Sequence, residues 1–381
     1  MSGHTTDLDL GLGKWWEMRT VGVEEELLLV DPDSGEPRAL AAAVLASAER
    51  ESSEDREVFE AELQREQLEF ATVPQESMDD LADEIGRRRA EAAHHAERLG
   101  AAVAALATSP LPVTPSLWGG ERYGWMAEEF GLTTQEQLTC GCHVHVAVES
   151  DEEGVAVLDR IRPWLPVLVA ISANSPFWQG KDSGYSSYRS RVWARWPSAG
   201  PVELFGSAER YHEQVEAMVG TGALHDQGMI YFDARLSHRY PTVEIRVADV
   251  CLDPGTTVLV ATLVRGLVET AAREWREGLP PVAHGVGLLR LAAWRASRSG
   301  LEERLIHPIT MRPEPAADVV RALLDHVGDA LKGTGDADRA ADAVAALHAD
   351  GNGARFQREL LQRTGSLRDV VAACVRRTAG R

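Results

Sequence analysis

Residues 21–31 read VGVEEELLLVD, an apolar segment interrupted at its centre by Glu24, Glu25 and Glu26. Side chains of a β-strand alternate between its two faces, so Glu24 and Glu26 share one face and Glu25 lies on the other. The two same-face carboxylates stand roughly 7 Å apart along such a strand. Like charges at that distance on an apolar strand are unfavourable unless a cation lies between them. This stretch therefore predicts a strand that presents a cation-binding pair of carboxylates.

Three later segments repeat this pattern of ionisable residues on a predicted strand. They are Glu69 in residues 62–72 (ELQREQLEFAT), His143 and His145 in residues 139–148 (TCGCHVHVAV), and Glu244 with Arg246 in residues 242–251 (TVEIRVADVC). If the four strands share one sheet, these faces together form a trough lined by carboxylates, which must either take up protons or bind cations. Oxygen-rich clusters suit Mg²⁺ or Mn²⁺ better than zinc, and Mg²⁺ in such sites commonly bridges to substrate phosphates.

Glu62 can join the carboxylates of this trough only if the chain bends between Glu62 and Glu69. It precedes Glu69 by seven residues, and that spacing puts the two on opposite faces of an unbroken strand. For both carboxylates to reach one site, the chain must bulge, bend or enter the strand between them.

The segment 174–200 is basic within an acidic chain. It contains Lys181, Arg189, Arg191 and Arg195 against the single acid Asp182, together with six aromatic residues. A loop of this length inside a globular domain is commonly functional, and its positive charge would suit phosphates. It could equally form the contact of a homodimer.

Simpler interpretations exist for each element taken alone, since Glu-x-Glu is common on solvated strand faces and His-x-His can be a structural or surface pair. Zinc is disfavoured at Cys140, Cys142, His143 and His145 because alternation sends Cys142 and His143 to opposite faces and no CxxC spacing occurs. The sequence also lacks a Walker motif, a GxGxxG fingerprint and a GxSxG elbow. The combination of the four strands and the basic loop favours a metal- and phosphate-binding site.

The composition is that of a soluble globular protein, with 381 residues, 44% of them hydrophobic and 26% charged. A formal net charge of −20 disfavours nucleic acid and anionic membranes as partners. No long apolar run and no basic-then-apolar N-terminus occurs, so we expect neither a membrane span nor a signal peptide. The four scattered cysteines suit reduced thiols and a cytoplasmic location.

Strand-like segments are concentrated before residue 252 and helical segments after it, which predicts an α+β fold with a largely antiparallel sheet. A further strand is expected at 229–237. Helices are expected at 77–106, at 150–173 with a kink or break at Pro163 and Pro166, at 256–277 and through most of the chain beyond. We expect one domain, 1–381, with 1–16 a loose lead-in and 309–381 a helical C-terminal part.

Six segments between about residue 20 and about residue 308 resemble one known family. They are GVEEELLLVDP, QLEFATVP, GCHVHVAV, NSPFWQGKDSGYSSYRSRVWARWP, FDARLSHRYPTVEIRVADVC and WRASRSGLEERLIHP. The family is that of the ATP-dependent carboxylate–amine ligases of the glutamate–cysteine ligase type, and the resemblance is closest to its type 2 branch. It implies a glutamine synthetase-like catalytic fold, in which a curved, mainly antiparallel sheet has helices packed outside.

The resemblance also implies the chemistry and the residues that perform it. ATP, with Mg²⁺ or alternatively Mn²⁺, phosphorylates the γ-carboxylate of glutamate, and an amine such as cysteine then attacks the acyl phosphate to form an amide. Arg246 is implied to neutralise the transferring phosphoryl group. The implied metal ligands are Glu24, Glu26, Glu62, Glu69, His143 and Glu244, and the implied ATP or substrate contacts are His145, Lys181, Tyr188, Arg189, Arg191 and Arg235.

Three alternatives stay open: a ligase for another amino acid and amine, a phosphoryl-transfer kinase on the same fold, and a catalytically silent binding protein. Two expectations concern single residues. Glu24→Gln should relieve like-charge repulsion in the metal-free protein and abolish metal-dependent turnover. Glu25, on the opposite face, should tolerate substitution far better with respect to catalysis than its neighbours.

Overall fold

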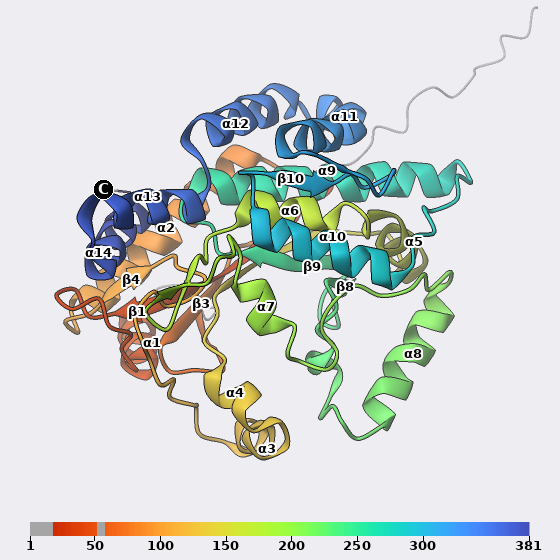
Figure 1. Ribbon diagram of the computed structural model, residues 1–381. Coiled ribbons are helices and arrows are strands. Elements are labelled where there is room, and N and C mark those ends of the chain that lie inside the picture. The colour runs from red at the N-terminus through yellow and green to blue at the C-terminus, as the bar shows by residue number, and fades with distance from the viewer. Residues whose placement is uncertain (1–17, 52–57, 381) are drawn as a thin grey trace, which may run out of the picture.

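A single antiparallel sheet runs through the centre of the protein (Figure 1), in a computed structural model that describes residues 18–51 and 58–380. The expected lead-in at 1–16 lies outside the described residues. The strand order is β2-β3-β1-β5-β9-β8, with β4 paired to the end of β1. The strands are β1 (Val21–Val30), β2 (Phe59–Ala61), β3 (Gln67–Ala71), β4 (Ala102–Ala104), β5 (Gly141–Ala147), β8 (Ala234–Leu236) and β9 (Thr242–Asp249).

The register of the sheet brings the predicted strands together as neighbours. Glu26 pairs with Glu69 across β1 and β3, and Glu24 pairs with His143 across β1 and β5. His145 in turn lies opposite Glu244 on β9. Side chains of directly opposed residues approach to about 5 Å, so these pairs are in contact range. The expectation that the four ionisable strands share one sheet is confirmed.

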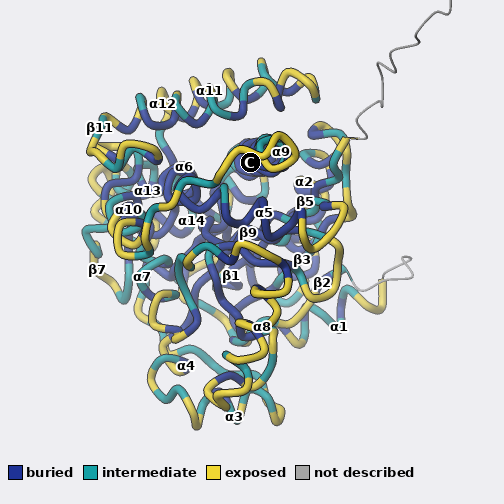
Figure 2. Tube along the Cα trace, turned by 90° about the vertical axis from the view of Figure 1, so that its right-hand side faces the viewer, coloured by how far each residue is buried: buried dark blue, intermediate teal, exposed yellow. Residues whose placement is uncertain are grey.

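Helices cover the sheet and supply most of the core. Helix α9 packs against β1 and β5, α6 packs against β9, and α11 and α12 lie outside α9 (Figure 1). Figure 2 shows the buried chain concentrated at the sheet and the helices next to it, with the exposed chain on the outer helices. The helices are α1 (Ala41–Glu51), α2 (Met78–Glu97), α3 (Glu121–Phe130), α4 (Leu132–Glu136), α5 (Asp151–Ile161), α6 (Leu165–Ser172), α7 (Arg189–Trp193), α8 (Ala208–Gly220), α9 (Pro254–Arg276), α10 (Val286–Ser299), α11 (Ala316–Thr334), α12 (Ala337–Asp350), α13 (Gly353–Thr364) and α14 (Leu367–Thr378), with a 3₁₀ turn at Gln227–Met229.

Helix α9 is the central core helix. It is the one helix among the described residues that is long and apolar enough to cross a membrane, yet 78% of its most apolar window is buried inside the fold. Asp253 caps its N-terminus by accepting a hydrogen bond from Gly255 N, and Pro254 occupies the first turn, where a missing N–H costs nothing. Its apolar side chains therefore stabilise the sheet rather than a membrane contact.

The α+β prediction is confirmed, but three predicted elements had wrong bounds. The helix expected at 77–106 ends at Glu97, because Gly100 adopts a positive φ of 68° and the chain re-enters the sheet as β4, where Val103 pairs with Leu29. The strand expected at 229–237 covers only Ala234–Leu236. The C-terminal region contains a hairpin, β10 (Arg304–Ile306) and β11 (Pro313–Pro315), among its helices. The break at Pro163 is confirmed, since α5 and α6 are separate helices.

The two faces of β1 have different partners. Glu25 is fully buried on the face toward the helices, where both of its oxygens accept hydrogen bonds from Arg89 of α2, at 2.7 and 2.8 Å. Cys142 and Cys251 lie near this pair, and burial raises the pKa of both thiols above the usual value. Glu24 and Glu26 occupy the opposite face. Cys142 and His143 thus lie on different faces, as the argument against zinc required.

Candidate active site

Two groups of side chains on the site face of the sheet could each hold a metal ion. The first, which we call the carboxylate group, consists of Glu26, Glu62 and Glu69. The second, which we call the histidine group, consists of Glu24, His145 and Glu244. In each group, one ligand atom from every member lies within 4.8 Å of the others.

The carboxylate group has an excess of negative charge. Burial and the neighbouring Glu62 raise the pKa of Glu26 to about 8, and the same two causes raise the pKa of Glu69 well above its usual value. In the described part of the chain, no lysine or arginine forms an ion pair with any of the three. Three buried or half-buried carboxylates without a cation must share protons or bind a metal. Their oxygen-only donor set fits Mg²⁺ or Mn²⁺.

A turn of the chain brings Glu62 into this group. Strands β2 and β3 form a hairpin in which Glu60, not Glu62, pairs with Glu69. Glu62 follows the end of β2, inside the connection that turns back into β3. The bend that the seven-residue spacing required is therefore present.

The histidine group, in contrast, is neutralised from within the protein. Nδ1 of His143 and Nε2 of His145 each lie 3.2 Å from a Glu24 oxygen. Although burial opposes it, these imidazoles hold the pKa of Glu24 well below its usual value. Burial and the nearby Arg246 lower the pKa of His143 to about 4, whereas Glu24 raises the pKa of His145 against the effect of burial.

Glu244 is bound by two arginines. Arg235 Nε donates to one of its oxygens at 2.7 Å, and Arg246 donates to the other. Against the effect of burial, the two guanidinium groups hold the pKa of Glu244 far below its usual range. Glu244 therefore stays ionised without a metal, and the carboxylate group is the better metal candidate. The histidine group, with an imidazole nitrogen beside carboxylates, suits Mn²⁺ better than Mg²⁺.

Two guanidinium groups form the positive side of the site. Arg189 and Arg246, which we call the arginine pair, each lie over the ring of Trp193, at 5.6 and 5.7 Å from its centroid. Both arginines are close enough to Glu26 to oppose the rise in its pKa. Among the described residues, the Nε atoms of both arginines are buried and have no hydrogen-bond partner. Buried unpaired donors beside uncompensated carboxylates are an arrangement that can bind a metal–phosphate complex.

The remaining predicted residues belong to neither of the two groups. Lys181 is exposed on a small hairpin formed by β6 (Phe177–Trp178) and β7 (Lys181–Asp182). Tyr188 packs between the rings of Trp178 and Tyr185. Arg191 lines a cavity next to the arginine pair.

Sequence reasoning missed the supporting role of two residues. Trp193 was counted only as one aromatic of the basic segment, although the guanidinium groups of Arg189 and Arg246 both lie over its ring. Gly141 donates its N–H to Glu26 at 2.7 Å, and its missing side chain leaves the space that Arg189 occupies. An added Cβ at Gly141 would lie 2.3 Å from Nη2 of Arg189. In the sequence, the glycine in GCHVHV was the only sign that another group lies close to the backbone here.

Comparison with known protein sequences relates the chain to one family. A family model described as glutamate–cysteine ligase family 2 matches residues 20–373. A protein of Streptomyces avermitilis that carries the provisional name glutamate–cysteine ligase 2-1 is 70% identical over 363 residues, which cover 95% of this chain and 100% of the relative.

Two solved structures share the fold. The glutamate–cysteine ligase of Francisella tularensis in complex with AMP has a TM-score of 0.69 at 12% identity, covering 95% of this chain and 88% of that one. A bifunctional glutathione synthetase of Pasteurella multocida has a TM-score of 0.70 at 14% identity. The match covers 95% of this chain and 52% of the synthetase. These neighbours confirm the fold expected from the sequence.

Proposed function

Since the chain belongs to the glutamate–cysteine ligase family 2, we propose that it is an ATP-dependent carboxylate–amine ligase. The expected reaction joins glutamate to an amine, with cysteine as the first acceptor to test, and yields an amide, ADP and phosphate. One observation supports this proposal most directly. The carboxylate group, which has an excess of negative charge, lies beside the positively charged arginine pair. We place the reaction in the cytoplasm, which suits the four free thiols.

The chemistry requires charge neutralisation and alignment more than a proton-transfer group. The carboxylate oxygen of the donor attacks the γ-phosphorus of ATP, the bond to ADP breaks, and an acyl phosphate forms. The amine then displaces phosphate from the acyl carbon and loses a proton. Arg246 and Arg189 would donate hydrogen bonds to the phosphoryl oxygens, on which negative charge develops. Glu244 would hold Arg246 in position, since the two already form an ion pair.

The carboxylate group fits the divalent cation that this reaction requires. Glu26, Glu62 and Glu69 would hold Mg²⁺ or Mn²⁺, and the raised pKa values of Glu26 and Glu69 indicate that the group lacks a cation partner in the protein. When bound, the cation would neutralise phosphate oxygens of ATP. The histidine group could hold a second ion. It is the weaker metal site, because Arg235 and Arg246 already neutralise Glu244.

The proposal is tested with purified protein, ATP, Mg²⁺, glutamate and a panel of amines. We expect phosphate release only when both glutamate and an amine are present, and a product whose mass equals their sum less one water. A phosphorylated product formed without an amine would identify a kinase instead. Absence of ATP binding by calorimetry would indicate a silent binding protein, and activity with another carboxylate would change the donor.

Arg246→Gln is expected to lower kcat by about 10²- to 10³-fold, because it removes a donor aimed at the developing charge. The matched control is Arg239→Gln, since Arg239 is an exposed arginine on the turn between β8 and β9. Steady-state phosphate release measures both variants. Equal activity of the two would remove Arg246 from the reaction.

Gly141→Ala is expected to displace the guanidinium of Arg189 and to lower kcat/KM by about 10- to 100-fold. The fold should be retained, because the clashing atom is the far end of a long side chain. Gly22→Ala on neighbouring β1 is the control, since an added Cβ there lies 3.9 Å from the nearest atom. If both alanine variants keep full activity, the position of Arg189 does not matter for turnover.

A further inference from the structure

A third group of metal-ligating side chains belongs to neither group of the active site. It consists of Glu51, the last residue of α1, and of His94 and His95 in the last turn of α2, and we call it the interhelix group. Helices α1 and α2 pack against each other. One ligand atom of each member lies within 4.8 Å of the others. Of the three metal-ligating groups among the described residues, this is the one with two histidines.

The two histidines are neighbours in space as well as in sequence. Their ring centroids are 5.3 Å apart and the ring planes meet at 73°. Nε2 of His94 lies 3.6 Å from Oε2 of Glu51. A tetrahedral ion with bonds of about 2.0–2.1 Å holds its ligand atoms about 3.3 Å apart. A small movement of the side chains is therefore enough to place all three around one ion.

His95 is the fixed member of the interhelix group. It is buried, and its ring makes a T-shaped contact with Phe59 of β2, with the centroids 6.4 Å apart. Its Nδ1 lies 3.2 Å from Oγ of Ser47, which is also buried. A metal-binding imidazole commonly donates its second N–H to an oxygen acceptor, which orients the ring. Burial also lowers the pKa of His95, which favours the neutral ring that a metal requires.

Glu51 and His94 are the adjustable members. The side chain of His94 is 60% exposed and that of Glu51 is 41% exposed, so both can turn toward an ion without repacking the core. Arg98 pairs with Oε1 of Glu51, while Oε2 faces His94. This ion pair competes with metal binding, but an exposed pair of this kind contributes little stability.

We propose that the interhelix group binds one Zn²⁺ ion and thereby links α1 to α2. Two imidazoles and one carboxylate are a donor set that zinc accepts, whereas Mg²⁺ prefers oxygen ligands alone. Three protein ligands leave the fourth position to water, on the exposed side of the group. Because His95 also contacts β2, the strand that leads to Glu62, the ion would stabilise this edge of the sheet.

Calorimetric titration of the full chain with Zn²⁺, in an excess of Mg²⁺ that competes at the carboxylate group, tests the proposal. The four cysteines are buried, so their thiols do not compete for zinc in the folded protein. Wild type is expected to bind one zinc ion per chain more than His94→Ala. Zn²⁺ at one hundred times Kd should raise the Tm of wild type by about 3 °C, and should leave the Tm of His94→Ala lower than that of wild type.

Two further variants act on the site without removing a ligand. Ser47→Ala keeps all three ligands but loses the acceptor that orients His95, so zinc affinity should fall by about 10- to 100-fold. Arg98→Gln should have the opposite effect and strengthen zinc binding by about two- to fivefold, because it releases Glu51 from a competing ion pair. A structural role of these residues alone would not produce tighter binding.

The matched control for histidine removal is His212→Ala. His212 is half-exposed, and its Nε2 lies 2.7 Å from Oδ2 of Asp151. This pair offers one imidazole and one carboxylate, which is one ligand fewer than the interhelix group. His212→Ala should therefore bind zinc as wild type does.

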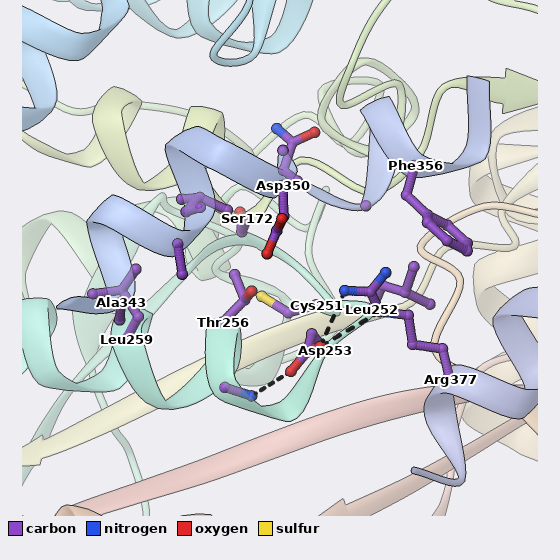
Figure 3. Close-up of a pocket in the computed structure, with 16 residues that line it drawn as sticks. Ser172, Cys251, Leu252, Asp253, Thr256, Leu259, Ala343, Asp350, Phe356 and Arg377 are labelled. Atoms are coloured by element: carbon purple, nitrogen blue, oxygen red, sulfur yellow. Dashed lines mark hydrogen bonds and ion pairs between the residues drawn. The ribbon is translucent and has the colours of Figure 1, made fainter. Parts of the chain in front are cut away.

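Glu51→Gln and Asp253→Asn form a matched pair of carboxylate variants. Figure 3 shows a cavity of about 190 Å³ where Asp253 pairs with Arg377, as Glu51 pairs with Arg98. None of the described residues that line this cavity is a histidine. Asparagine is a good helix N-cap, so Asp253→Asn should preserve α9. We expect Glu51→Gln to weaken zinc binding by about tenfold or more and Asp253→Asn to leave it unchanged.

Several outcomes would overturn the proposal. Equal zinc stoichiometry and affinity in wild type and His94→Ala would exclude the interhelix group as a site. An equal loss in His212→Ala or Asp253→Asn would show that zinc binds the surface without selection. Weaker binding in Arg98→Gln would exclude Glu51 as a ligand. If His94→Ala does not fold, Glu51→Gln replaces it, and unchanged zinc affinity is then the contrary result. The titrations contain neither ATP nor glutamate, so their result is independent of the ligase reaction.

Discussion

Glu26→Gln is expected to raise the free energy of unfolding of the metal-free protein and to lower metal-dependent turnover by about 10²- to 10³-fold. The two effects have one cause. Glu26 is a buried carboxylate beside Glu62 and Glu69, and its pKa is raised to about 8. Glutamine removes the repulsion but also removes a proposed metal ligand. It still accepts the hydrogen bond from Gly141 N through its amide oxygen.

The pH dependence gives the sign of this effect. The pKa of Glu26 is 4.5 as a reference and about 8 in the folded protein. Between these values the folded protein binds a proton that the unfolded chain releases, so the free energy of unfolding falls as pH rises, by at most about 1.4 kcal/mol per pH unit from one such group. Glu26→Gln should flatten this slope.

Chemical denaturation in EDTA between pH 5 and pH 8 measures the slope. The control is Glu60→Gln, because Glu60 also lies opposite Glu69 but is exposed on β2. Added Mg²⁺ or Mn²⁺ should stabilise wild type by about 2.7 kcal/mol at one hundred times Kd, and should stabilise Glu26→Gln far less. A variant less stable than wild type at pH 8 without metal would contradict the assignment of Glu26.

The structure reverses the corresponding expectation for Glu24. Glu24 lies between two imidazoles that hold its pKa well below the usual value, so it is not a repelled carboxylate. A depressed carboxyl pKa contributes stability above its unfolded pKa and loses it as pH falls. Glu24→Gln should therefore destabilise the metal-free protein.

This contrast marks the limit of the sequence-based reasoning. Alternation along β1 predicted correctly that Glu24 and Glu26 share a face. It could not predict that β3 brings a carboxylate to Glu26 while β5 brings imidazoles to Glu24, because strand order is a property of the whole fold. The arginine pair depends likewise on α7, a five-residue helix that was expected to be loop. Short elements of this kind have no periodicity to detect.

The predicted end of the helix at 77–106 was wrong for a related reason. Val103 and Leu106 continue the apolar spacing of α2, and both are buried, but Val103 lies on β4, where it pairs with Leu29 of β1, and Leu106 follows that strand. A short apolar run suits a helix and a buried strand equally well. Gly100, which ends the helix, was the one local sign of the boundary.

Glu25→Gln is expected to lower the free energy of unfolding by about 3–5 kcal/mol. Glu25 is fully buried and binds Arg89 through both oxygens, and it also accepts a hydrogen bond from Thr257 at 2.6 Å. Glutamine leaves the guanidinium of Arg89 buried without a counter-charge. The predicted tolerance of Glu25 toward substitution therefore applies to catalysis and not to stability.

Two measurements separate these roles. Denaturant unfolding should show a lower midpoint for Glu25→Gln, whereas kcat of the folded protein should stay close to wild type, because Glu25 lies on the face opposite the carboxylate group. The double variant Glu25→Leu with Arg89→Met should recover much of the loss, since apolar residues of similar volume can replace a buried ion pair. A stable Glu25→Gln would show that Arg89 is held well enough by the carbonyl oxygens of Cys251 and Leu252, to which it also donates. A loss of kcat without a loss of stability would place Glu25 in the reaction and contradict the alternation from which the site was derived.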